Sequence, residues 1–202
     1  MRVRVSMRNR HVHGRLRLMS ACGLLVGMTL LATQRTPNPA PIRFRDIAKQ
    51  AGLTKVPHSS PEKRYLVEMM GGGVALFDCD HDGKLDILVV NDSTIDRYLQ
   101  GGDLMVTLYH QDANLHFTDI TQQAGLITRG WGMGVAVADF DNDGLPDIYV
   151  TGYGHNVLYR NLGGCKFQNV TERARVQGGG FSVGAAWADY DRDGYLDLFV
   201  SR

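Results

Sequence analysis

Residues 139–150 read DFDNDGLPDIYV, a stretch that places four aspartates in nine positions ahead of a short run of β-branched and aromatic residues. The same frame, D-x-D-x-D-G-x-x-D, begins again at Asp78 and at Asp189. Together the three frames supply twelve of the 21 acidic residues of the chain. Carboxylates this close together repel one another, so the repeated crowding predicts a cationic partner.

The spacing of the frame is typical of a loop that binds a hard cation through oxygen atoms. Glycine at position 6 (Gly83, Gly144, Gly194) permits a positive φ, which lets the aspartates at positions 1, 3, 5 and 9 converge. Ca²⁺ accepts six to eight oxygens in an irregular shell, whereas Mg²⁺ requires an octahedron, so calcium is favoured, with about one ion per loop. Position 7 is expected to contribute its backbone carbonyl. The predicted ligands are Asp78, Asp80, Asp82, Lys84, Asp86, Asp139, Asp141, Asp143, Leu145, Asp147, Asp189, Asp191, Asp193, Tyr195 and Asp197.

Two other interpretations of the loops were considered. An EF-hand needs glutamate at position 12 and helices on both sides, but this position holds Val89, Val150 or Val200 in strand-like runs, which excludes it. Plain polar turns would leave the repeated charge unexplained. If each loop binds calcium with a Kd near 10⁻⁴ M, millimolar calcium stabilises the fold by about 1.4 kcal/mol per site, so the ion is expected to be structural.

A second repeated phrase indicates the architecture. FRDIAKQAGL (44–53), FTDITQQAGL (117–126) and FQNVTERARV (167–176) share one pattern, and the last two copies each begin 22 residues before an acidic loop. The loops at Asp139 and Asp189 lie 50 residues apart, with insertions expected near 54–66 and 92–103 in the first unit.

Each period contains four short strand-like runs, such as GGVALF, DILVV, VTLYHQ and HFTDIT, and no helix beyond one or two turns within the repeated phrase. We therefore expect an all-β fold of four-stranded antiparallel β-propeller blades, forming a partial propeller of about three blades.

The amino-terminal segment predicts export. Residues 1–17 contain six arginines, and residues 18–32 form an uncharged, mostly apolar run of 15 residues, shorter than the roughly 20 needed to span a bilayer. We predict a signal peptide at 1–32, cleaved near Ala32. Retention as an amino-terminal anchor is the alternative, and membrane contact is expected only through the signal or such an anchor. A lipoprotein attached through Cys22 is disfavoured because this cysteine stands at the front of the apolar run.

The predicted organisation is thus a signal, a linker at 33–41 and a repeat domain at 42–202, with a periplasmic, extracellular or cell-surface location. Residues 41–202 contain 15 basic and 21 acidic residues, a net charge of −6 that argues against a nucleic-acid partner. Cys79 and Cys165 form no C-x-x-C motif and no disulfide framework, and a bridge between them is not expected.

Three stretches resemble FG-GAP or VCBS-type calcium-binding repeat proteins, and within them the cartilage acidic protein group that carries an ASPIC/UnbV domain. They are YLVEMMGGGVALFDCDHDGKLDILVVN (65–91), NVLYRNLGGCKFQNVTE (156–172) and AAWADYDRDGYLDLFVSR (185–202). The resemblance implies a β-propeller like that of the integrin α-subunit head, with calcium on the loop aspartates. Such propellers close with about seven blades. The chain holds two complete units, part of a third and a lone early strand at 42–47, which indicates an amino-terminal fragment.

The motifs favour a noncatalytic protein that binds a protein or glycan ligand at the cell surface. No H-E-x-x-H or G-x-S-x-G motif occurs, and the glycine-rich stretches MGGGVAL and QGGGFSVG lack the helix that a phosphate site needs. Trp131 and Trp187 occupy nearly equivalent places in successive units, which favours packing between blades over ligand stacking. The alternative function is a propeller domain of an enzyme that acts on extracellular polysaccharide.

Overall fold

The computed structural model describes residues 43–58, 60, 65–70 and 72–202. The predicted signal at 1–32 and linker at 33–41 lie outside the described residues and stay predictions. Among the described residues, none of the helices combines the length and the apolar character that a membrane crossing requires.

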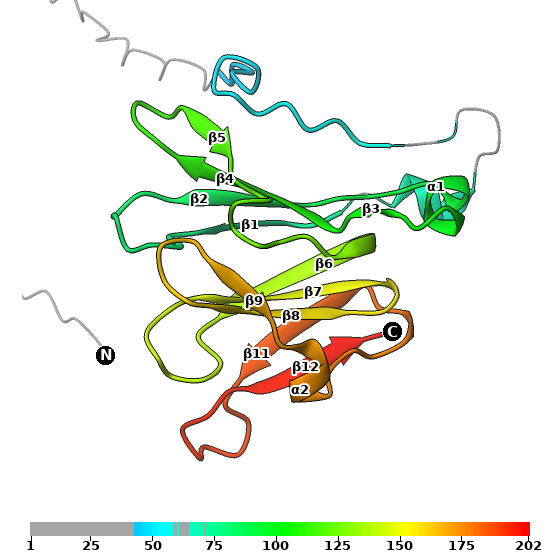
Figure 1. The fold of residues 1–202 in the computed structure, drawn as a ribbon, viewed down its shortest axis with the longest axis vertical. Helices are drawn as coiled ribbons and strands as arrows, with labels where there is room; N and C mark the ends of the chain where they lie inside the picture. Colours follow the sequence, from blue (N-terminus) through cyan, green and yellow to red (C-terminus); the bar gives the residue numbers. More distant parts are fainter. Residues whose placement is uncertain (1–42, 59, 61–64, 71) are drawn as a thin grey trace, which may run out of the picture. The chain divides into compact units, whose positions relative to one another are not determined.

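The described chain is almost entirely β-structure, folded into antiparallel sheets (Figure 1). Blade 1 contains, in spatial order, β1 (Val74–Phe77), β2 (Asp86–Val90), β4 (Val106–Gln111) and β5 (Phe117–Asp119). Blade 2 contains β6 (Arg129–Ala138), β7 (Asp147–Gly154), β8 (Val157–Asn161) and β9 (Phe167–Asn169). Blade 3 is represented by the hairpin of β11 (Gly184–Ala188) and β12 (Asp197–Ser201). The predicted fold class, a partial β-propeller of four-stranded antiparallel repeats, is confirmed.

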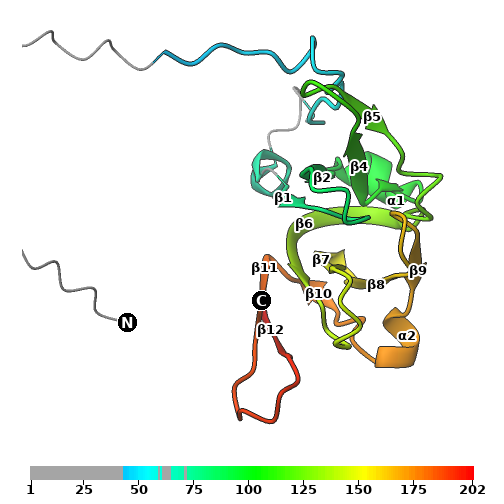
Figure 2. The same cartoon turned by 90° about the vertical axis from the view of Figure 1, so that its left-hand side faces the viewer.

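In the described chain, two short strands and three short helical elements lie beside the main strands of the blades. Strand β3 (Asp103–Leu104) pairs with β6, and β10 (Gly180–Phe181) pairs with β7. The helical elements are η1 (Leu66–Met69), α1 (Ile95–Leu99) and α2 (Thr171–Ala174). Figure 2 shows β6 curving between the strands of blade 1 and those of β7 and β8.

Two expectations about local structure were wrong. Helix α1 lies in the insertion at 92–103, where no helix was expected; the Thr94 side chain caps it by accepting a hydrogen bond from the Arg97 backbone N–H at 3.3 Å. The early strand expected at 42–47 is not a strand in its described part, residues 43–47, because no neighbouring strand pairs with it there.

Apolar side chains alternate between the two faces of each strand, so one face of each blade is buried against the next blade. In β7, Ile148 and Val150 belong to the apolar cluster shared with blade 1, whereas Tyr149 belongs to the cluster shared with blade 3. Successive side chains of a strand point to opposite faces, so one strand supplies both interfaces. The core of this protein therefore lies between blades.

Each copy of the second repeated phrase is linked to the copy before it at the outer edge of a blade. The Phe117 backbone N–H donates a 2.8 Å hydrogen bond to the Ala51 carbonyl. One repeat later, the Phe167 N–H donates to the Ala124 carbonyl at the same distance. Gly125, next to Ala124, has a φ of 82°, and a Cβ there would lie 2.7 Å from the Phe167 carbonyl oxygen. A residue without a Cβ is thus required at Gly125 by the close backbone approach.

A disulfide joins Cys79 to Cys165, contrary to the sequence-based expectation. Cys79 is position 2 of the first acidic loop, and Cys165 lies in the β8–β9 turn, 86 residues later. Packing of blade 2 on blade 1 brings their Cα atoms to 5.0 Å, within the range that a bridge requires. Sequence spacing alone carries no information on this contact.

The bridge is expected to contribute strongly to stability because it closes a long loop. Reduction, or the double substitution Cys79→Ala with Cys165→Ala, should lower the free energy of unfolding by about 2–5 kcal/mol. Urea denaturation of the oxidised and reduced protein measures the difference, with the double variant as a control that must not respond to reductant. Equal midpoints for the oxidised and reduced protein would contradict this expectation.

Candidate metal centres

The three acidic loops are the hairpin turns of successive blades. Loop 1 (78–86) joins β1 to β2, loop 2 (139–147) joins β6 to β7, and loop 3 (189–197) joins β11 to β12. All three emerge on the same side of the blades, at the left of Figure 1, whereas α1 and the β7–β8 turn lie on the opposite side. The blade architecture therefore repeats one chemical site along one rim.

The aspartate at position 1 shapes each loop by accepting backbone hydrogen bonds. In loop 1, Asp78 accepts from the N–H groups of Asp82 at 3.1 Å and Gly83 at 2.9 Å. The corresponding distances are 3.0 and 2.8 Å in loop 2, and 3.1 and 3.1 Å in loop 3. Each loop thus forms the same turn around its first carboxylate.

Two residues per loop adopt the left-handed conformation. Glycine at position 6 has φ of 83°, 90° and 91° in loops 1 to 3, as the sequence predicts. Position 4 is also left-handed, with φ of 62° at His81, 58° at Asn142 and 65° at Arg192. This second requirement was missed, because the three residues share no side-chain type, and arginine is not typical of that conformation.

In loops 1 and 2 the aspartate at position 9 is buried and accepts from two backbone amides, whereas Asp197 of loop 3 is exposed and accepts from the Tyr190 N–H at 2.9 Å. Asp147, 1% exposed, accepts from the N–H groups of Phe140 at 3.1 Å and Asn161 at 2.7 Å. Burial raises the pKa of Asp147 from 3.8 to about 6, and the charges of Asp141 and Asp143 add to the shift. Asp86 is held in the same way in loop 1, and burial raises its pKa too.

Each loop brings together the oxygens of three aspartates. The grouped ligand atoms lie within 4.8 Å of one another and belong to Asp78, Asp80 and Asp86 in loop 1, to Asp139, Asp141 and Asp143 in loop 2, and to Asp189, Asp191 and Asp197 in loop 3. The remaining predicted carboxylates, Asp82, Asp147 and Asp193, fall outside these groups. The role of the position 7 carbonyls at Lys84, Leu145 and Tyr195 stays a prediction.

Basic side chains, to which the sequence assigned no role in charge compensation, lie against the loop carboxylates. In loop 2, Arg160 of β8 places Nε 2.5 Å from Asp141 and Nη2 2.8 Å from Asp143. In loop 1, the equivalent residue His110 lies 3.2 Å from Asp80, and Lys84 forms an ion pair with Asp82. The paired strand sequences LYHQ and LYRN, each with a basic residue after tyrosine, are the signal that could have revealed this.

In loop 2, one carboxylate oxygen is available to bind a cation. Oδ1 of Asp141 is buried and has no hydrogen-bond partner among the described residues, although its other oxygen pairs with Arg160. A buried carboxylate oxygen without a donor is costly unless a cation approaches it. The chemistry of the donor set, oxygen atoms only, therefore fits a hard divalent cation.

Two further clusters among the described residues, Cys79–Asp86–Cys165 and Asp80–His110–Cys165, also have ligand geometry, but their sulfurs are committed to the disulfide. Among the described residues, the three loops are therefore the candidate metal centres.

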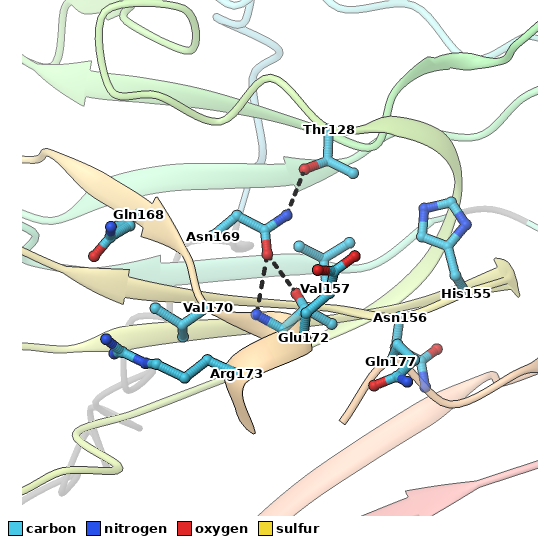
Figure 3. A pocket seen from close by; sticks show the side chains of 11 residues that line it. Thr128, His155, Asn156, Val157, Gln168, Asn169, Val170, Glu172, Arg173 and Gln177 are labelled. Carbon is cyan, nitrogen blue, oxygen red and sulfur yellow. Dashed lines mark hydrogen bonds between the residues drawn. The ribbon is translucent and has the colours of Figure 1, made fainter. Parts of the chain in front are cut away.

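Away from the loops, a polar cavity of about 600 Å³ lies between blade 2 and α2 (Figure 3). Its floor includes Asn169, which donates to the Thr128 hydroxyl at 3.1 Å and accepts from the backbone N–H of Thr171 at 3.0 Å. Polar side chains that also line it include Gln168, Glu172 and Arg173. This cavity is a second place where a ligand could bind.

A profile of the FG-GAP-like repeat matches residues 78–150 and 139–200, so the matched segments begin and end at the acidic loops and their strands. The chain belongs to the FG-GAP-like repeat family. No curated protein matches its sequence. The match covers all three acidic loops, and it supports the predicted FG-GAP or VCBS-type repeats without addressing the ASPIC/UnbV group.

The raised pKa of Asp147 predicts that the calcium-free FG-GAP protein loses folding stability as the pH rises. Between pH 4 and about 6, the folded state holds a proton on Asp147 that the unfolded state releases, so folding stability falls as pH rises through this window. Calcium binding requires the ionised carboxylate and opposes this trend. Melting temperatures in EGTA should decrease from pH 5 to pH 7, and Asp147→Asn should reduce the decrease. A melting temperature that rises over this interval in EGTA would contradict the assignment.

Arg160 is expected to compete with a cation in loop 2. Arg160→Gln removes the guanidinium from Asp141 and Asp143, so it should lower the melting temperature in EGTA and increase the calcium affinity of one site. Calorimetric titration measures the affinity, and Arg173→Gln, a change away from the loops, should leave it unaltered. Weaker calcium binding in Arg160→Gln would show that the arginine supports the site instead.

Proposed function

We propose that this chain is an exported, calcium-binding, noncatalytic β-propeller repeat protein that mediates protein or glycan interaction at the cell surface. The observation that carries the calcium assignment is the convergence of three aspartate carboxylates within 4.8 Å in each of three successive loops. Asp141 Oδ1, buried and without a hydrogen-bond partner in the part of the chain that the structure describes, adds a specific oxygen for the ion. Calcium would balance the loop charge and hold each hairpin closed.

The disulfide supports export. Cys79 and Cys165 are buried at 0% and 3% exposure, and disulfides persist mainly in oxidising compartments such as the periplasm and the extracellular space. The arginine-rich start and the apolar run at 18–32 remain the sequence basis for a signal peptide, with an anchor as the alternative. Membership of the cartilage acidic protein (ASPIC/UnbV) group and the status of an amino-terminal fragment rest on the resemblance and are part of this proposal.

The interaction role is supported by the polar cavity opposite the acidic loops. Amide, imidazole, guanidinium and carboxylate groups of its lining offer both donors and acceptors, which suits a glycan or a peptide backbone. The negative net charge of residues 41–202 disfavours nucleic acid as the ligand.

One observation favours the alternative, a domain of a polysaccharide-acting enzyme. A second cavity, of about 530 Å³, is lined by Lys55, His58, Tyr109, Asp103 and Asp119 among others. The hydroxyl of Tyr109 accepts from the backbone N–H of Lys55 at 3.0 Å, and Asp103 is bound by Arg97 through two 2.6 Å hydrogen bonds. These groups are engaged in structural contacts, which is why the binding function is preferred.

A calcium titration tests the main proposal. Calorimetry should detect three sites per chain. If each Kd is near 10⁻⁴ M, the free energy of unfolding in EGTA should be about 4 kcal/mol lower than in millimolar calcium. Asp141→Asn should remove one site, whereas Glu172→Gln, outside the loops, should retain all three. No heat of binding together with a melting temperature that ignores EGTA would refute the proposal.

A screen on a glycan array, in parallel with an assay for new reducing ends on extracellular polysaccharides, separates the two functions. Binding without bond cleavage supports the noncatalytic role. Cleavage that is lost in Lys55→Ala or Tyr109→Phe would instead establish the enzyme.

A further inference from the structure

The cavities of about 530 and 600 Å³ occupy equivalent places in blades 1 and 2, and are called the blade 1 cavity and the blade 2 cavity. The lining of each includes the third, fifth and sixth residues of the repeated phrase that begins at Phe117 or at Phe167. These residues are Asp119, Thr121 and Gln122 in blade 1, and Asn169, Thr171 and Glu172 in blade 2. Each cavity also has a wall from the segment after the preceding copy of the phrase, where Lys55 corresponds to Thr128.

The same hydrogen bonds build the framework of both cavities. Oδ1 of Asp119 accepts from the backbone N–H and the hydroxyl of Thr121, at 2.9 and 2.6 Å. Oδ1 of Asn169 makes the same two contacts with Thr171, at 3.0 and 2.6 Å. In both blades the threonine hydroxyl also accepts from a backbone N–H of the neighbouring strand at 2.9 Å. Each cavity is therefore a property of the repeat, and its walls come from one blade and the phrase copies that flank it.

The residues around this shared framework give the two cavities different charge. The charged residues of the blade 2 lining are one glutamate, one arginine and one histidine. In the blade 1 lining, three side chains are cationic at neutral pH and two are carboxylates: Lys55, Arg97 and Arg129, against Asp103 and Asp119. The blade 1 cavity thus has an excess of one positive charge within a segment, 41–202, whose net charge is −6.

Positive charge in the blade 1 cavity gathers around Asp103. Arg97 donates to this carboxylate through Nε and Nη2, both at 2.6 Å. The bond from Arg97 lowers the pKa of Asp103, and the charges of His58 and Lys55 lower it further. A carboxylate that is already bound bidentately by Arg97 offers little more to Lys55.

Two cations of the lining keep charge that a ligand can use. Lys55 forms no ion pair with another described residue. Arg129 donates through Nε and Nη2 to the Gly102 carbonyl at 3.1 and 2.8 Å, a neutral acceptor that leaves the guanidinium charge uncompensated. Lysine and arginine in one cavity are suited to bind a carboxylate.

Hydrogen-bonding groups lie in the same cavity as these cations. Thr121 uses Oδ1 of Asp119, and no other described residue donates to its Oδ2. The Tyr109 hydroxyl accepts from the backbone N–H of Lys55 at 3.0 Å, which leaves its own proton to be donated. Among the lining residues that the structure describes, Val56 and Leu104 are the aliphatic ones, so the cavity offers little to the apolar side chains of a peptide.

We propose that the blade 1 cavity binds an acidic sugar, a uronate unit of a glycan. Lys55 and Arg129 contact the sugar carboxylate, and Asp119 accepts hydrogen bonds from the sugar hydroxyls. A cavity that combines cations with hydrogen-bond acceptors matches a ligand that carries a carboxylate beside several hydroxyls. The inference rests on the interaction function proposed above and gives it a ligand class.

Two substitutions remove the cations one at a time. Lys55→Gln and Arg129→Gln shorten no wall of the cavity, and thermal melting should show that both variants fold. Lys49→Gln is the matched control, because Lys49 is exposed and lies outside the lining.

Calorimetric titration of the full chain with a tetrasaccharide that contains glucuronate gives the test, with the methyl ester of the same tetrasaccharide as the neutral probe. The acid should bind, and the ester should bind roughly tenfold more weakly, because it loses the charge-assisted hydrogen bonds. Lys55→Gln and Arg129→Gln should each weaken binding of the acid by a similar factor, and Lys49→Gln should bind as the wild-type chain does. Absence of binding by the acid, equal affinities for acid and ester, or cavity variants that bind like the wild-type chain would overturn the proposal. A tetraglutamate peptide that binds as tightly as the acid would overturn the assignment to a sugar.

Failure of the uronate site is distinguishable from failure of the proposed function. A chain that binds neutral glycans or a protein ligand, but not the acid, overturns the uronate site and leaves the interaction function standing. A chain that binds no glycan on the array and no protein ligand contradicts both.

Discussion

Repulsion among the aspartates of each loop is the constraint on which the structure depends. Part of that charge is offset by the chain itself, because the carboxylates at positions 1 and 9 accept backbone hydrogen bonds and shape the turn. Basic side chains such as Arg160 offset a further part of the loop charge. Carboxylate oxygens of three aspartates in each loop nevertheless lie within 4.8 Å of one another, where a divalent cation would complete the compensation.

Loop geometry and blade packing are tied to one another by the residues between the aspartates. Position 2 packs against or bonds to the following blade, as Cys79 does with Cys165, and position 4 reaches the glycine carbonyl of the next loop. A loop that opens would therefore disturb the interface as well as its own site. Through this coupling, the proposed ion on the rim would stabilise a core that lies between blades.

Much of this arrangement could be predicted from periodic features of the sequence. The D-x-D-x-D-G-x-x-D frame and the alternating strands identify the hairpins, and the repeated phrase identifies the turn whose Ala124 carbonyl binds Phe167. What could not be predicted depends on contacts between blades. The Cys79–Cys165 bridge and the approach of Arg160 to Asp141 arise from packing, and local spacing says nothing about either. Helix α1 lies in an insertion without a counterpart in the other repeats, so comparison within the chain could not reveal it.

The most direct test of the account is anomalous diffraction from crystals of the chain grown with calcium. The account predicts one calcium peak in each of the three loops, with carboxylate oxygens at about 2.3–2.6 Å and Arg160 displaced from Asp141 in loop 2. Loops without a peak at saturating calcium, with Arg160 still paired to both aspartates, would contradict it.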